Sequence, residues 1–243
     1  MEIIKLTTTE STNSFLKNLV KNATPNNFTT IVAQKQTKGK GQQESNWFSE
    51  PNKNLTFSVF LSHENLKITH QKSLNFAISL AVYDVLFSKK ISGISIKWPN
   101  DILFVDKKIC GILIENTLSG GNIKNSIVGI GLNVNQEKFP KSLTKVTSLK
   151  LETLIEYNLD MLLTEIIVEL QKKLQLLETQ KYMFLEKRYL EVLYKKGTPS
   201  MFKNNRDEVF RGTIHGVSKN GKIEIQLDDN SIKEFGIKEV SFL

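Results

Sequence analysis

The chain has 243 residues, of which 40% are apolar and 24% charged, which suits one large domain, or one large and one small, with an ample core. The net charge of +8 permits an acidic partner such as a nucleic acid, an acidic protein or a phosphorylated small molecule. Because the lysines are spread along the chain rather than clustered, the charge favours a solvated basic surface.

Cysteine and histidine usage excludes several kinds of site. The single cysteine, Cys110, cannot form an intramolecular disulfide or assemble a thiolate metal site. The three histidines are scattered, with no pair at metal-ligand spacing. No apolar run approaches the ~20 residues that cross a bilayer, and the N-terminus has no signal-peptide core. These features predict a soluble, cytoplasmic protein without a membrane partner.

Apolar periodicity predicts a mixture of strands and helices up to residue 193. Strand-like runs cover residues 2–6, 28–34, 54–62, 94–98, 109–115 and 123–134. Helical spacing covers residues 70–90, with one buried stripe, and residues 159–177 and 182–194. Ser11-Thr12-Asn13 has the residue types that begin a further helix. Within residues 54–62, Phe60 interrupts the polar face, which suggests that both faces are partly covered.

The pattern changes after Gly197 to short alternating strands. These runs cover residues 209–217, 222–227 and 231–235, and Asn220-Gly221 is a strong hairpin signal between the first two. Strands of this kind over about 45 residues predict a small antiparallel barrel. We therefore expect an α+β chain with a large domain at residues 1–193 and a small one at residues 194–243.

Two early segments carry residue types suited to a small polar or anionic ligand. Ser11-Thr12-Asn13 would be a helix cap if considered alone, although the same groups can donate to a ligand. The loop at residues 36–49, QTKGKGQQESNWFS, has Gly39 and Gly41, which permit positive φ and a close approach of backbone N–H groups to an anion. Trp47 suits stacking on a purine or filling the core.

Two later segments place polar groups at strand ends. In IKWPNDILFVDKKICGILIE, residues 96–115, a hairpin brings Lys107-Lys108 near Asn100 and Asp101, a grouping that can bind a phosphate–Mg²⁺ pair. IVGIGLNVN, residues 127–135, is a strand whose glycines mark a close backbone approach. Asn133 emerges where its apolar run stops.

In this order, the four segments resemble those of biotin–protein ligases of the monofunctional type, and the resemblance covers essentially the whole chain. It implies a mixed sheet with flanking helices, related to class II aminoacyl-tRNA synthetase catalytic domains, plus a small C-terminal SH3-like β barrel. It also implies a two-step reaction. Biotin and ATP–Mg²⁺ give biotinyl-5′-AMP and pyrophosphate, and a lysine of a biotin carboxyl carrier domain then takes the biotin.

The resemblance implies roles for named residues. Lys108 would bridge the biotin carboxylate and the α-phosphate, Asp101 would orient or deprotonate the incoming lysine, and Lys40 would be a further catalytic cation. The implied biotin-binding residues are Ser11, Thr12, Asn13, Gln36, Gly39, Lys40, Gly41, Gln42, Lys108 and Gly111. The implied ATP-binding residues are Lys40, Trp47, Asn100, Lys108 and Asn133. Mg²⁺ would arrive with ATP, near Asn133, without a dedicated protein cage.

The glycine-rich loop departs from the family pattern at its centre. Many members continue the glycine–basic–glycine core with two arginines and a glycine, whereas this chain has Gln42-Gln43-Glu44. Each change of charge beside a phosphate could change the free energy of binding that phosphate by ~1 kcal/mol at an effective dielectric constant of ~20. We therefore hypothesise weaker retention of biotinyl-AMP than in arginine-rich relatives, with Lys38 and Lys40 as partial compensation.

Other interpretations stay open from the residues. A lipoate–protein ligase or an octanoyltransferase would share the fold, but the cysteine nucleophile of the latter would have to be Cys110, which lies in an apolar strand. A nucleic-acid- or protein-binding module would use the basic charge and the barrel, which lacks interleaved surface aromatics. Because the first motif begins at Ser11, we expect no helix-turn-helix domain and no specific DNA. A homodimer could form through residues 139–146 or a strand edge.

Overall fold

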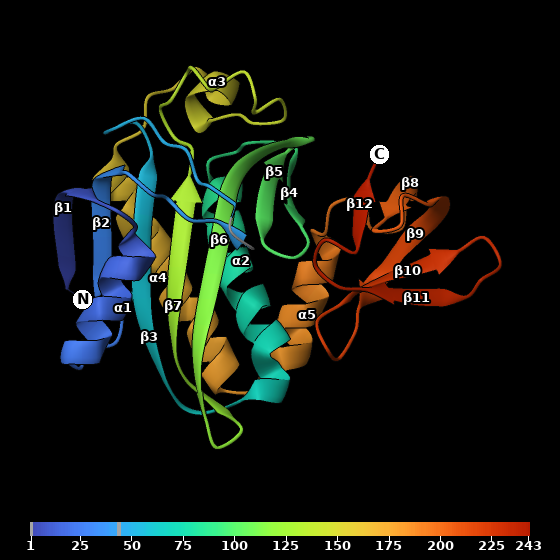
Figure 1. Cartoon of the computed structure of the whole chain (residues 1–243), viewed down its shortest axis with the longest axis horizontal. Helices are drawn as coiled ribbons and strands as arrows, with labels where there is room; N and C mark the ends of the chain where they lie inside the picture. Colours follow the sequence, from blue (N-terminus) through green and yellow to red (C-terminus); the bar gives the residue numbers. More distant parts are fainter. Residues whose placement is uncertain (1, 43–44) are drawn as a thin grey trace.

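A computed structural model describes residues 2–42 and 45–243 (Figure 1). Gln43 and Glu44, two of the three residues at which the loop departs from the family pattern, lie outside the described residues, as does Met1. The chain forms a large sheet covered by helices and a small sheet near the C-terminus. The α+β prediction is therefore confirmed.

The large sheet contains seven strands in the order β1-β2-β3-β7-β6-β5-β4. β1 and β2 are parallel and the other neighbours are antiparallel, so the sheet is mixed, as predicted. All strand-like runs before residue 193 fall in this sheet, and β5 is an addition. The strands are β1 Ile3–Thr9, β2 Thr30–Gln36, β3 Leu55–Lys67, β4 Ile94–Lys97, β5 Asp101–Phe104, β6 Lys107–Ser119 and β7 Asn122–Leu132.

Strand β3 is covered on both faces, as Phe60 suggested. Every residue from Leu55 to Leu61 is buried. The main core contains Leu55, Phe57, Val59 and Leu61, which share it with helices α2 (Gln71–Ser88) and α4 (Leu159–Glu178). Phe60 instead packs in a second cluster with Leu16 of α1 (Thr12–Asn22). Helices on both sides explain why residues 55–61 of the strand are buried on both faces.

Helix α2 is buried far beyond the single stripe that its sequence predicts. Its buried residues also include Ser73, Ser79 and Tyr83, which lie off that stripe. The helix packs against α4 and α5 (Tyr182–Glu191) as well as against β4 and β5. The prediction of one buried face was wrong because neighbouring helices cover the sides that the sheet leaves open.

The remaining helices agree with the predictions, with small shifts. α4 begins after Asn158, whose side chain accepts a hydrogen bond from Met161 N at 3.0 Å. α5 ends at Glu191, before the predicted residue 194. The short helix α3 (Leu149–Thr153) and the 3-10 turn η2 (Ile68–His70) were not predicted. In the described part of the chain, no helix is long and apolar enough to span a membrane.

The C-terminal residues form a second, five-stranded antiparallel sheet in the order β11-β10-β9-β8-β12. Gly221 in the predicted hairpin turn has φ of +77°. Over residues 194–243, the edge strands β11 and β12 do not pair with each other, so the sheet is open and the predicted closed barrel is not found. Both edge strands are short. The strands are β8 Pro199–Asn204, β9 Val209–Val217, β10 Ile223–Leu227, β11 Ile232–Phe235 and β12 Val240–Phe242.

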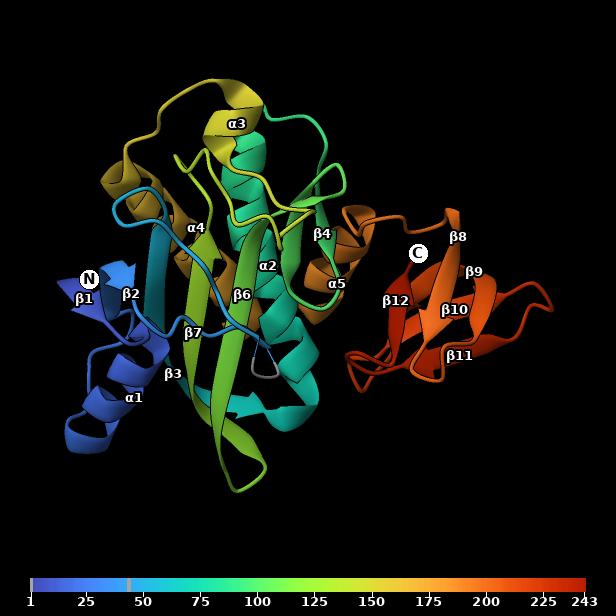
Figure 2. The ribbon, with the colours of Figure 1, turned by 45° about the horizontal axis from the view of Figure 1, so that its top comes forward.

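The small sheet lies beside the β4–β5 end of the large sheet (Figures 1 and 2). The Trp98 indole Nε1 donates a hydrogen bond to the Gly221 carbonyl oxygen at 3.0 Å. Phe242 of β12 packs edge-on against Tyr194, with ring centroids 5.3 Å apart. The backbone N–H of Tyr194 in turn donates to the Ile96 carbonyl oxygen at 2.8 Å. These contacts fix the small sheet against the turn that contains KWPND.

Candidate active site

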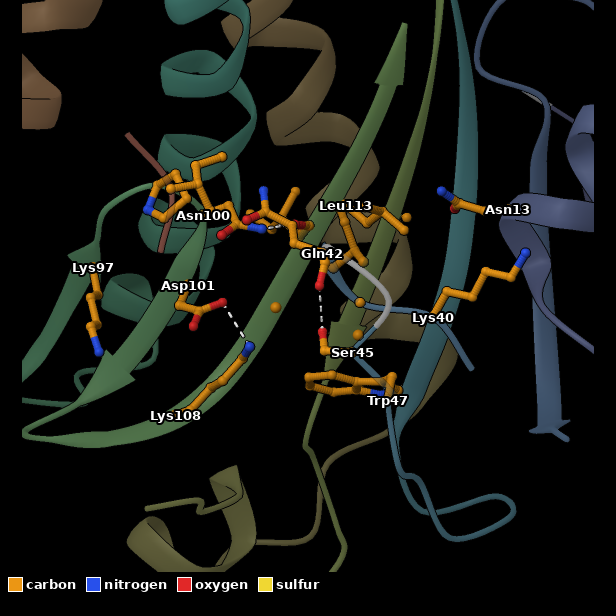
Figure 3. A pocket seen from close by; sticks show the side chains of 18 of the residues that line it. Asn13, Lys40, Gln42, Ser45, Trp47, Lys97, Asn100, Asp101, Lys108 and Leu113 are labelled. Atoms are coloured by element: carbon orange, nitrogen blue, oxygen red, sulfur yellow. Dashed lines mark hydrogen bonds and ion pairs between the residues drawn. The ribbon is translucent and has the colours of Figure 1, made fainter. Parts of the chain in front are cut away.

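A cavity of about 440 Å³ lies on the large sheet, on the face turned away from α2 and α4 (Figure 3). It brings together residues from distant parts of the sequence: the start of α1, the glycine-rich loop, the β4–β5 turn and β6. The predicted site residues that line it are Ser11, Thr12, Asn13, Gln36, Lys40, Gly41, Gln42, Trp47, Asn100, Asp101, Lys108 and Gly111. Gly39 and Asn133 are not among its lining residues.

One end of the cavity is a buried cluster of hydrogen-bonding groups. Gln36 Oε1 accepts hydrogen bonds from Thr12 N at 2.8 Å and from Thr12 Oγ1 at 3.2 Å. Ser58 Oγ, from β3, lies 2.7 Å from Thr12 Oγ1 and 2.5 Å from Asn13 Oδ1. Ser11 stands at the N-cap position of α1, yet its side chain makes no capping hydrogen bond. The hydroxyl of Ser11 is therefore not used by the helix that it precedes.

Asn13 is fixed by its neighbours on two strands. Its Nδ2 donates to Glu115 Oε2 at 2.8 Å, and Glu115 also pairs with Lys17. A Cβ atom on Gly129 would lie 2.3 Å from Asn13 Oδ1, so the glycine is needed for this close approach. The strand glycine therefore serves a contact between protein groups, which the sequence pattern alone does not distinguish from an approach to a ligand.

The described parts of the glycine-rich loop pair antiparallel at Lys40 and Asn46 and cross β7 and β6 (Figure 2). Trp47 N donates to the Gly39 carbonyl oxygen at 2.9 Å, and Gly41 N donates to the Ser45 carbonyl oxygen at 2.6 Å. Gly39 and Gly41 are not among the positive-φ glycines, so the expectation of positive φ was wrong. Their lack of a side chain matters for space, because a Cβ on Gly39 would lie 2.5 Å from the Trp47 carbonyl oxygen.

The Trp47 ring lies on a floor made of two glycines. A Cβ on Gly131 would lie 2.4 Å from Trp47 Cε2, and one on Gly111 would lie 3.0 Å from Cζ3. Lys108 Nζ lies 5.6 Å from the ring centroid. The Trp47 indole Nε1 is buried and has no hydrogen-bond partner. The ring thus offers an unused donor beside the cavity.

Lys108 and Asp101 form an ion pair in the cavity, with Nζ 2.7 Å from Oδ1 (Figure 3). They come from adjacent strands, because β5 starts at Asp101 and Lys108 lies at the beginning of β6. Asn100 makes two hydrogen bonds with the backbone of Ile112. Its side-chain amide donates to the Ile112 carbonyl oxygen, and its main-chain carbonyl oxygen accepts from Ile112 N at 3.1 Å. Asn100 therefore fixes the turn that presents Asp101.

Lys40 is directed away from this ion pair. Its Nζ donates to Ser14 Oγ on α1 at 3.1 Å, and Figure 3 shows the side chain pointing away from Asp101 and Lys108. Gln42 lines the cavity, and its backbone carbonyl accepts a hydrogen bond from Ser45 Oγ at 2.8 Å. The structure thus brings Asp101 and Lys108 together but does not bring Lys40 to them.

Asn133 belongs to a second, smaller cavity of about 230 Å³. Trp47 and Lys108 line both cavities, so they stand between the two. Asn133 Nδ2 donates to the Thr147 carbonyl oxygen at 3.0 Å, whereas its buried Oδ1 has no partner. Residues 142–146, which follow β7 along the chain, form another wall of this cavity.

Several residues of the site were missed from the sequence. Lys97 lines the main cavity, and Ile237, Val240 and Ser241 extend it onto the small sheet. Lys97 could have been found, since it begins the KWPND motif, whereas no sequence signal indicates that the C-terminal strand reaches the cavity. Over residues 2–42 and 45–243, no group of three or more His, Cys, Asp or Glu side chains could hold a metal ion.

Cys110 is fully buried in β6, and this burial raises the pKa of its thiol. Nearby Lys108 lowers that pKa by a smaller amount. A thiol that stays protonated is a poor nucleophile, and this one has no contact with solvent. The structure therefore gives no support to an octanoyltransferase mechanism through this cysteine.

The fold is that of biotin protein ligases. The solved structure of the biotin protein ligase from Aquifex aeolicus in complex with biotin and ATP superposes with a TM-score of 0.80 at 27% identity, covering 100% of this chain and 98% of that one. A model of the biotin/lipoate A/B protein ligase family matches residues 5–133. The chain belongs to this family.

Two bifunctional ligase/repressor BirA proteins show how far the sequence relation extends. The protein of Bacillus subtilis is 36% identical over 124 residues, which covers 49% of this chain and 37% of its own. The protein of Escherichia coli is 26% identical over 198 residues, which covers 81% of this chain and 61% of its own. The chain thus spans less than two thirds of the length of either relative.

Proposed function

We propose that this protein is a biotin–protein ligase, which activates biotin with ATP and transfers it to a lysine of a biotin carboxyl carrier domain. The observation that carries the proposal is a single cavity that joins a buried hydrogen-bonding cluster to the Lys108–Asp101 ion pair. A substrate with a polar head and a carboxylate tail would use both ends. The related enzyme of Aquifex aeolicus binds biotin and ATP, which supports the same pair of substrates here.

In the first step, a carboxylate oxygen of biotin attacks the α-phosphorus of ATP. The new O–P bond gives biotinyl-5′-AMP, and the bond to the bridging oxygen breaks, so that pyrophosphate leaves. No side chain is needed as a nucleophile, because the substrate supplies it. The protein has to hold two anions together, and Lys108 would lie between them and stabilise the charge that develops on the phosphate.

In the second step, the ε-amine of the acceptor lysine attacks the biotin carbonyl carbon, and AMP leaves with its phosphate oxygen. The attacking nitrogen has to lose a proton. Asp101 would orient the amine or accept that proton. When the phosphate neutralises Lys108, Asp101 becomes available to a second ammonium group.

Biotin would lie with its ureido head in the hydrogen-bonding cluster. Because Thr12 already occupies Gln36 Oε1, the Gln36 amide nitrogen is the group oriented toward a ligand acceptor. The Ser11 hydroxyl would add a further partner. Both ends of the Asn13 amide are used within the protein, so Asn13 would act by positioning the cluster. Buried polar groups of this kind discriminate strongly against analogues that leave them unpaired.

ATP would extend from the main cavity into the second one. The Trp47 ring lines the second cavity and its face suits stacking on a heterocyclic base, to which the unpartnered Asn133 Oδ1 would be an acceptor. Mg²⁺ prefers oxygen ligands and usually binds through one or two of them together with phosphates. The Asp101 carboxylate is a ligand of that type in the main cavity, so Mg²⁺ would arrive with ATP and bind beside it. Lys40 would have to leave Ser14 to reach a phosphate.

A labelling experiment tests the function directly. The protein is incubated with ATP–Mg²⁺, a carrier domain and either biotin or lipoate, and the carrier is analysed by mass. We expect the mass increase of one biotin and none with lipoate, and no increase without ATP. Labelling with lipoate alone would make the protein a lipoate ligase, and no labelling with either acid would favour a binding module.

The remaining expectations stay predictions. We propose that residues 1–193 form the catalytic domain and residues 194–243 a small C-terminal domain that completes the cavity wall. We also propose that the protein lies in the cytoplasm and can associate as a homodimer.

A further inference from the structure

Lys97 is a cation in the cavity to which the sequence analysis gave no role. It ends β4, lines the main cavity and is half-buried. In the part of the chain that the structure describes, it forms no ion pair. Its Nζ instead lies 5.7 Å from the centroid of the Phe242 ring, which comes from the small sheet. An aromatic face attracts the ammonium group of a half-buried lysine but supplies no counter-ion.

Lys97, Asp101 and Lys108 place three charges at one end of the cavity (Figure 3). The single carboxylate pairs with Lys108 at 2.7 Å, so the group carries an excess of positive charge. Burial lowers the pKa of Lys97, the neighbouring Asp101 raises it, and Lys108 lowers it again. An anion bound in the cavity would stabilise both lysines, because it supplies the missing counter-charge.

The strand register determines which part of a ligand Lys97 can reach. Asp101 on β5 stands opposite Lys97 on β4. Lys108 on β6 stands opposite Leu103, but its Nζ reaches back along β5 to Asp101 Oδ1 at 2.7 Å. Neighbouring strands are ~4.8 Å apart, so β4 and β6 are separated by ~10 Å. If Lys108 contacts the α-phosphate, a chain of phosphates that continues across β5 reaches Lys97. We expect a single phosphate held at Lys108 to make less contact with Lys97 than such a chain does.

We propose that Lys97 binds the β- and γ-phosphates of ATP, the part that leaves as pyrophosphate, and that Phe242 positions it for this contact. The inference rests on the proposed function for the identity of the anion. Phe242 is itself fixed, because its ring packs against Tyr194 at 5.3 Å and Phe202 at 4.8 Å between centroids. The small sheet would thus take part in nucleotide binding through an aromatic ring that holds the lysine.

The test compares ATP with AMP by calorimetric titration, without biotin or carrier domain. Lys97→Met should weaken ATP binding by about tenfold, the usual effect of losing a charge-assisted contact, and leave AMP binding within about twofold of the native value. Lys97→Arg should restore most of the ATP affinity. Phe242→Leu should weaken ATP binding by less than Lys97→Met, and the double variant should be no worse than Lys97→Met alone.

Lys124→Met is the matched control, because it removes an exposed lysine from β7 outside the cavity and should change neither affinity. Circular dichroism of each variant verifies the fold. If Lys97→Met loses equal affinity for ATP and for AMP, or keeps the native affinity for ATP, the inference is overturned. The labelling assay tests the proposed function separately. If the native protein labels the carrier and Lys97→Met binds ATP with native affinity, only the role of Lys97 is refuted.

Discussion

Asn13 lies so close to Gly129 that a methyl group on the glycine would come within 2.3 Å of the Asn13 side-chain oxygen. The contact joins the start of α1 to β7. Ser58 and Glu115 hold the two ends of the same amide. The position of the hydrogen-bonding cluster therefore depends on a residue without a side chain.

Gly129→Ala should displace Asn13 and weaken biotin binding by at least about tenfold. Overpacking of this kind also costs about 1–3 kcal/mol of stability. Gly216→Ala in the small sheet is the control, because the nearest atom to its Cβ is the mobile Glu224 carboxylate, at 3.0 Å. Calorimetry with biotin measures the difference. Native affinity in Gly129→Ala would show that the close contact does not position the cluster.

Lys108→Gln should lower the rate of biotin-dependent pyrophosphate release by about 10²–10³, the usual effect of removing a group that stabilises transition-state charge. Lys107→Gln is the matched control, because that neighbour is exposed and pairs with Glu152 at 3.5 Å. Its rate should stay within about twofold of native. If both variants react equally fast, Lys108 has no part in the activation step.

Gln42→Arg should slow the dissociation of biotinyl-5′-AMP. One added positive charge within a few ångströms of the phosphate is worth ~1 kcal/mol, which corresponds to about fivefold, and the gain should shrink in high salt. A chase of labelled intermediate with unlabelled biotin and ATP measures the rate. Gln42→Leu controls for the altered side-chain size. An unchanged rate in Gln42→Arg at low salt would refute the hypothesis of weak retention.

His63 should make the folded protein less stable in weak acid. Burial lowers the pKa of its imidazole to about 4, and Nε2 lies 2.9 Å from Ser126 Oγ. Between pH 6.5 and 4 the unfolded chain binds a proton that the folded chain does not, so the free energy of unfolding falls as the pH falls. The loss approaches about 2 kcal/mol near pH 4.5.

Urea unfolding at pH 7 and pH 4.5 measures this effect. His63→Gln should lose about 2 kcal/mol less than the native protein between these two pH values. His215→Gln, at an exposed position, should follow the native protein. The same pH dependence in His63→Gln and in the native protein would assign the acid sensitivity to other groups.

The arrangement of the main elements could be predicted because periodicity records which face of a segment is buried. The strands of the large sheet other than β5, and helix α4, were predicted for this reason. The burial of α2 on several sides was not, since it depends on α4 and α5, which follow it far along the chain. The open form of the small sheet depends on pairing at its edges, which the turn signals do not specify.

The site was predicted where a motif carries its own chemistry, as with Lys108 and Asp101, which form the ion pair. The prediction of the site was incomplete where a contact comes from a distant part of the chain. Asn13 engages Ser58 and Glu115, which no motif includes. The proximity of Phe242 to Lys97 joins residues from two sheets, and only the folded chain brings them together.

Both tryptophans of the chain, Trp47 and Trp98, line the main cavity. Their indole groups differ, since Trp98 Nε1 is bound to the Gly221 carbonyl oxygen and Trp47 Nε1 has no partner. The tryptophan emission of the unlabelled protein therefore comes entirely from the site. A ligand that gives Trp47 a partner should change this emission, so occupancy can be followed in real time without a dye.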